Sequence, residues 1–60
     1  MPLSGAEMRR RFEGEDWAFD HQTGSHMILK KEGRHVSIPN HRELGKGLET
    51  KLLKILRGEK

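Results

Sequence analysis

A histidine that follows a glycine–serine pair is the side chain best suited to chemistry in this sequence. His26 comes directly after Gly24-Ser25 and before the apolar residues Met27-Ile28-Leu29. Imidazole titrates near neutral pH, so it can accept or donate a proton under ordinary conditions. Held at the start of a strand in basic surroundings, such a group would suit the cleavage or the binding of a phosphodiester.

The charges of the chain favour a phosphate-bearing partner. Residues 1–20 carry three arginines against five carboxylates, and residues 21–60 carry nine Lys/Arg against four glutamates, so net charges of −2 and +5 sum to +3. A basic segment of this kind suits nucleic acid, although an ordinary solvated surface has the same composition. The cations that could follow a phosphate backbone are Lys30, Lys31, Arg34, Arg42, Lys46 and Lys51.

Four further residues could assist a histidine at a phosphate. Lys30 falls on the same side of a strand as His26, because side chains of a strand alternate between its two faces. The Ser25 hydroxyl could donate to a phosphate oxygen, and Lys46, between two glycines before a helix, would bring its ammonium to a positive helix end. His41 could transfer a second proton or contact nucleic acid, but a solvated loop histidine is its simpler interpretation.

The composition excludes several classes of site. The chain has no cysteine, so neither a disulfide nor a thiolate metal site can form. Its four histidines, at positions 21, 26, 35 and 41, match no standard zinc spacing, and we expect no metal and no cofactor. Sixty residues without an apolar run longer than three predict one domain over residues 1–60, monomeric and cytoplasmic, with no membrane span.

Local patterns predict the element order α-β-β-β-α. Ser4 and Glu7 have the spacing of a capping box at the start of a helix, and apolar residues at helical spacing predict another helix at the end. The predicted elements are a helix over residues 5–13, strands over 17–21, 26–31 and 35–39, and a helix over 47–57. The fold class is therefore α+β, with a three-stranded antiparallel sheet that both helices cover on one face.

Alternation leaves open which face of the middle strand is buried. His26 and Ile28 share one face, and Met27 and Leu29 share the other. A bulge near Ser25 would turn the histidine outward if its own face were the buried one.

The first and third strands carry aromatic and imidazole side chains as well. Trp17 and Phe19 fall on one face of the first strand, where packing in the core is a more ordinary role than stacking on a base. His21 and His35, on the first and third strands, are expected to point outward.

Four segments in order resemble the HicA toxin family, the small mRNA-cleaving ribonucleases of HicAB toxin–antitoxin systems. The segments are Ser4-Gly5-Ala6-Glu7, Gly24-Ser25-His26, Gly33-Arg34-His35-Val36-Ser37-Ile38-Pro39 and Glu43-Leu44-Gly45-Lys46-Gly47-Leu48. No single segment is specific, but their order and spacing resemble the family from Ser4 to about Leu56.

The resemblance implies a fold similar to a double-stranded RNA-binding domain and a metal-independent endoribonuclease that cleaves mRNA. His26 occupies the position of the family's catalytic histidine, and the implied partner is a HicB-like antitoxin. We expect RNA contacts from Ser25, Lys30, Lys31, Arg34, His41 and Lys46. The alternatives are a non-catalytic RNA-binding module of the same fold, and a protein whose basic face docks an acidic partner.

The chain departs from the family pattern at two places. Many members of the family have a second histidine directly after the catalytic one, where this chain has Met27. The first helix of the family is usually more aliphatic, whereas here Arg9-Arg10-Arg11 leaves only Met8 and Phe12 as its apolar face and could contact RNA or the antitoxin.

Overall fold

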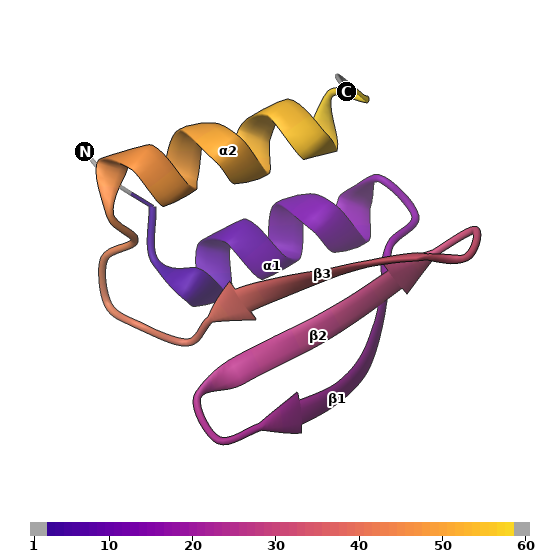
Figure 1. Ribbon diagram of the computed structural model, residues 1–60, viewed down its shortest axis with the longest axis horizontal. Helices are drawn as coiled ribbons and strands as arrows, with labels where there is room; N and C mark the ends of the chain where they lie inside the picture. The colour runs from indigo at the N-terminus through magenta and orange to yellow at the C-terminus, as the bar shows by residue number, and fades with distance from the viewer. Residues whose placement is uncertain (1–2, 59–60) are drawn as a thin grey trace.

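The chain forms two helices and one antiparallel sheet. The computed structural model describes residues 3–58. The elements are α1 (Gly5–Gly14), β1 (Ala18–Thr23), β2 (His26–Lys31), β3 (Arg34–Pro39) and α2 (Lys46–Leu56), and the strands pair in the order β1-β2-β3 (Figure 1). The predicted α+β class and the order α-β-β-β-α are confirmed.

Burial shows that the helices cover one face of the sheet. Met27 and Leu29 of β2 are 3% and 0% exposed, and Val36 and Ile38 pair with them from β3 and are also buried. These side chains pack in one cluster with residues of both helices and of the connections, namely Met8, Phe12, Trp17, Leu44 and Leu52. Met8 and Phe12 are completely buried, so the thin apolar face of the arginine-rich helix suffices to anchor it.

Three strand boundaries differ from the sequence-based prediction: both ends of β1, and the start of β3, which begins one residue earlier at Arg34. β1 begins at Ala18 and continues to Thr23, because Trp17 lies in the connection from α1, where its N–H donates to the Phe12 carbonyl oxygen at 3.0 Å. Trp17 is still a core residue, and its ring meets Phe12 edge-on with centroids 5.3 Å apart. Phe19 lies at the rim of the sheet and is 37% exposed, so it does not share that buried position.

The capping box predicted at the start of α1 is present. The Ser4 hydroxyl accepts from the Glu7 N–H at 3.1 Å, and the Glu7 carboxylate accepts from the Ser4 N–H at 3.0 Å. Hydrogen bonds from the Ser4 backbone and side chain hold the pKa of the Glu7 carboxyl below its ordinary value.

A glycine allows α1 to touch the end of β3. The Gly5 N–H donates to the His41 carbonyl oxygen at 2.8 Å, and a Cβ at Gly5 would lie 2.0 Å from the Pro39 carbonyl oxygen. The nearest atoms are backbone atoms of Pro39 and Asn40, which cannot move aside easily, so residue 5 has no room for a side chain. The start of β2, the end of β3 and the start of each helix lie at the same end of the molecule (Figure 1), so this contact fixes the region around them.

We expect Gly5→Ala to lower the free energy of unfolding by at least about 2 kcal/mol, since the new methyl group would force the helix away from the sheet. The matched control is Gly14→Ala at the other end of the same helix, where a Cβ meets nothing within 4 Å and the helix propensity of alanine should raise stability by up to about 1 kcal/mol. Urea titration followed by circular dichroism measures both changes. Equal stabilities of the two variants would contradict the assigned contact.

Candidate active site

His26 lies on the face of the sheet that the helices leave uncovered. Because Met27 and Leu29 point to the helices, alternation directs the exposed His26 to the opposite face. The question that the sequence left open is thus settled by packing, and no bulge at Ser25 is involved. We call this surface the open face; its residues are Ala18, His21 and Thr23 of β1, His26, Ile28 and Lys30 of β2, and His35, Ser37 and Pro39 of β3.

The backbone around His26 is held by the neighbouring strand and loop. His26 pairs with Pro39, and the Asn40 N–H donates to the Ser25 carbonyl oxygen at 2.6 Å, which extends the pairing by one step. The next loop residue, His41, accepts the bond from Gly5 described above. Ser25 and His41 are therefore placed at the same end of the sheet as His26, with exposed side chains.

Lys30 shares the open face with His26, as alternation predicts. Four residues of strand separate their Cα atoms by about 13 Å. Its ammonium lies 3.5 Å from a carboxylate oxygen of Asp20, and both side chains remain accessible to solvent.

Two other predicted RNA contacts are directed elsewhere. Lys31 points to the helix side, where its ammonium donates to the Glu15 carbonyl oxygen at 2.7 Å, just beyond the end of α1. Arg34 pairs with Lys31 in the sheet, and its guanidinium lies 5.8 Å from the centroid of the Trp17 ring. Both cations therefore stabilise the fold at the far end of the β2–β3 hairpin, away from His26.

Lys46, another predicted RNA contact, is the exposed first residue of α2. It follows Gly45, the N-cap residue, which provides no side-chain cap. The loop before it is fixed by a bond from the Leu44 N–H to the Leu3 carbonyl oxygen at 2.9 Å. The start of α2, to which Lys46 belongs, and the start of β2 lie at the same end of the molecule (Figure 1).

Sequence reasoning did not find a polar cluster on β1. The pairing of β1 with β2 shifts between Phe19 and His21, so that Asp20 forms a β-bulge. Asp20 Oδ2 lies 2.5 Å from His21 Nδ1 and 3.5 Å from Lys30 Nζ. The adjacent Asp-His pair was the available signal, but its partner on β2 becomes visible only in the paired sheet.

The carboxylate of this cluster is stabilised in its ionised form. The hydrogen bond from His21, followed by the nearby charge of Lys30, holds the pKa of the Asp20 carboxyl below its ordinary value. An ionised Asp20 can only accept a hydrogen bond, so His21 must donate to it from Nδ1–H. A neutral His21 ring in this contact therefore has its lone pair on Nε2.

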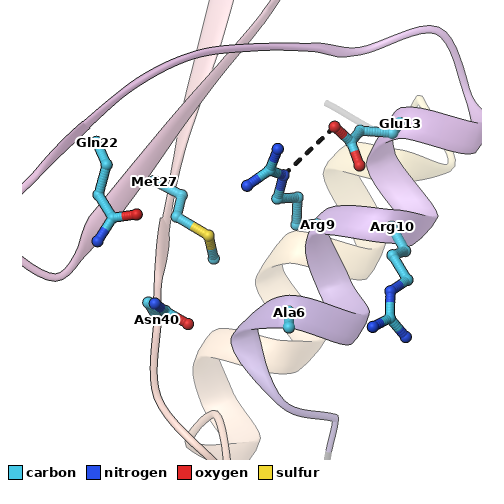
Figure 2. A pocket seen from close by; sticks show the side chains of 7 residues that line it. All are labelled: Ala6, Arg9, Arg10, Glu13, Gln22, Met27 and Asn40. Carbon is cyan, nitrogen blue, oxygen red and sulfur yellow. Dashed lines mark hydrogen bonds and ion pairs between the residues drawn. The ribbon is translucent and has the colours of Figure 1, made fainter.

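A groove of about 410 Å³ lies on the other side of the sheet from the open face, between α1 and the strands. Figure 2 shows Gln22, Met27 and Asn40 on its sheet side and Ala6, Arg9 and Glu13 on its helix side; Arg10 completes the lining. Arg9 pairs with Glu13 at 3.3 Å, and its guanidinium stacks 4.0 Å from the centroid of the Phe19 ring. The first arginine of the run therefore covers an exposed aromatic ring.

Residues 3–58 offer neither a metal site nor a membrane-spanning helix. They contain no group of three or more His, Asp or Glu side chains arranged to hold a metal ion. Neither described helix is long and apolar enough to cross a membrane.

Comparison with family models places the chain in a class of small toxins of bacterial toxin–antitoxin systems. The family model described as "HicA toxin of bacterial toxin-antitoxin" matches residues 5–57, which is nearly the whole chain. The chain belongs to this family. No curated protein and no solved structure matches it.

We expect the pKa of the Asp20 carboxyl to lie below the ordinary value for aspartate. His21→Gln should raise this pKa, because glutamine provides neither the ring N–H donor nor the positive charge of a protonated imidazole. Since the folded pKa lies below the unfolded one, the stability that Asp20 contributes is complete above the unfolded value and is lost as pH falls through the folded value. Carboxyl ¹³C chemical shifts followed from pH 7 to pH 2 measure the pKa. An unchanged midpoint in His21→Gln would refute the assigned contact.

Proposed function

We propose that this chain is the toxin of a type II toxin–antitoxin system and that it cleaves mRNA as a metal-independent endoribonuclease. The catalytic residue is His26. The observation that carries the proposal is the position of His26, exposed on the uncovered face of the sheet in a chain of the HicA toxin family. A ring packed under the helices could not reach a phosphodiester.

The chemistry needs few protein groups, because RNA carries its own nucleophile. The 2′-hydroxyl attacks the adjacent phosphorus once its proton is removed, and the 5′-oxygen leaves once it is protonated. A histidine supplies one such transfer, which contributes roughly 10²–10⁴-fold in rate. Positive charge beside the phosphate stabilises the charge that develops on its oxygens.

The RNA is expected to lie along the open face. Lys30 meets a phosphate next to the cleaved one, while Ser25, His41 and Lys46 are available at the His26 end. Lys31 and Arg34, which are also expected to contact RNA, lie on the helix side and at the distal end of the β2–β3 hairpin, so they would meet RNA only beyond the open face. Such contacts to phosphate make binding weaken as salt concentration rises.

The inhibiting partner is a HicB-like antitoxin that binds over the open face and covers His26. The net charge of +3 suits an acidic partner surface, and residues that meet RNA phosphates would meet carboxylates of the inhibitor in the same way. One surface then serves both partners, so that a bound antitoxin excludes RNA.

We expect His26→Ala to lower the rate of RNA cleavage by about 10²–10⁴-fold and to abolish growth arrest, with its fold intact because the ring is exposed. The assay is cleavage of a labelled RNA in the presence of EDTA, compared with wild type. His35→Ala, which removes an exposed histidine from β3 of the same face, is the matched control and should keep most of the activity.

Two results would contradict this proposal. If His26→Ala cuts RNA as fast as wild type, His26 is not the catalyst. If wild type binds RNA without cutting it and His26→Ala binds equally, the chain is an RNA-binding module of the same fold.

We expect the antitoxin to protect His26 from acylation by diethyl pyrocarbonate, because the inhibitor would cover the open face. Mass spectrometry of the free toxin and of the complex measures the rate at each histidine peptide. An unchanged rate at His26 in a complex that no longer cuts RNA would indicate inhibition by another route.

A further inference from the structure

Cleavage by transesterification requires two proton transfers, and a single imidazole supplies one of them at a time. The second group must lie close enough to His26 to reach the same phosphate, either in the loop after β3, which carries His41, or on the open face. The residues that could exchange a proton near neutral pH on this face are His21 and His35.

The β-bulge at Asp20 determines where His21 points. Phe19 pairs with Leu29 on the helix side of the sheet, and strict alternation would place His21 on that side as well. The extra residue shifts the register, so that His21 pairs with Ile28 and joins the open face. Without the bulge, the His21 ring would lie on the helix side of the sheet, and the sheet itself would separate it from His26.

The register also places the two rings near each other. Thr23 pairs with His26 and His21 pairs with Ile28, so the two histidines are diagonal neighbours on adjacent strands. Such neighbours lie roughly 7–8 Å apart, a separation from which two imidazoles can approach opposite oxygens of one phosphate. His35 lies farther away, because it pairs with Lys30, four residues along β2 from His26.

Asp20 gives His21 a defined orientation and tautomer. The bond of 2.5 Å between Asp20 Oδ2 and His21 Nδ1 fixes the ring and directs its proton to Nδ1. His21 retains an exposed side chain, 54% accessible, so Nε2 is available to a substrate. The pair has the same division of roles as a carboxylate that orients a catalytic histidine in a hydrolase.

We propose that His21 is the second catalytic residue of RNA cleavage, the general base, and that Asp20 is its positioning residue. The inference rests on the proposed ribonuclease function. His21 Nε2 takes the proton of the 2′-hydroxyl as the 2′-oxygen bonds to phosphorus, the bond from phosphorus to the 5′-oxygen breaks, and protonated His26 gives its proton to that oxygen. The products are a 2′,3′-cyclic phosphate and a 5′-hydroxyl, and exchange with water restores both imidazoles.

The charged surroundings are compatible with these roles. The titratable groups that share the open face with His21 are His26, Lys30 and His35, while Asp20 contacts it from the bulge. Neither described helix packs against this side. The Lys30 ammonium lies 3.5 Å from the same carboxylate, and in the proposed complex it would meet a second phosphate of the RNA.

The test compares His21→Gln with the matched control His35→Gln, both exposed histidines of outer strands on one face. We expect His21→Gln to lower kcat/KM by about 10²–10⁴-fold and to remove the acidic limb of its pH profile, since that limb reports protonation of the base. His35→Gln should stay within about threefold of wild type and keep both limbs. Affinity for an RNA with a 2′-deoxy group at the cleavage site should be unchanged in both variants.

Asp20→Asn tests the positioning role separately. We expect its kcat to fall while the acidic limb remains, because His21 is still present but less well oriented. Asp20→Glu, which keeps the carboxylate, should recover part of the rate. Melting temperatures of all four variants serve as the check on folding.

The outcomes separate this inference from the proposed function. If wild type cuts RNA, His26→Ala does not, and His21→Gln keeps its rate within threefold together with its acidic limb, the role of His21 is refuted and the ribonuclease stands. If wild type does not cut RNA at all, the proposed function fails and the inference fails with it.

Discussion

One-sided burial of the sheet determines where the candidate functional side chains point. The helices pack against Met27 and Leu29, and alternation then directs His26 and Lys30 to solvent. The same rule sends Lys31 to the helix side, where it contacts the Glu15 carbonyl beyond α1. Successive basic residues in the sequence therefore divide between a side that stabilises the fold and a side that is free to meet a ligand.

The bulge at Asp20 is the one place where β1 departs from this alternation, and the departure has a chemical consequence. Phe19 stays on the helix side under the guanidinium of Arg9, while His21 joins the open face. Bulges cost a regular ladder hydrogen bond and are common where a side chain must be re-aimed. Here the bulged residue is itself a hydrogen-bond partner of the histidine that it redirects, so its side chain and its backbone act together.

The elements could be predicted because each depends on short-range patterns. The Ser4–Glu7 capping box, the alternation in β2 and β3 and the apolar stripe of α2 all act over a few residues. Which face carries His26 could not be predicted, because it depends on packing between elements. The contact of Gly5 with Pro39 and the bulge at Asp20 were missed for the same reason, since each requires a partner distant in the sequence. The predicted RNA contacts at Lys31 and Arg34 rested on charge alone, which does not specify a face.

Alternation also explains why Met27 in place of a second histidine leaves the open face unaltered. Position 27 faces the helices, 3% exposed, on the opposite side of the sheet from the ring of His26. A histidine there would line the groove beside α1, and β2 would separate it from a phosphate bound at His26. Residues adjacent in a strand cannot share a face. In the proposed mechanism, a second imidazole can therefore come from the neighbouring strand or from the loop after β3 but not from position 27, and the paired strand β1 provides His21 on the open face.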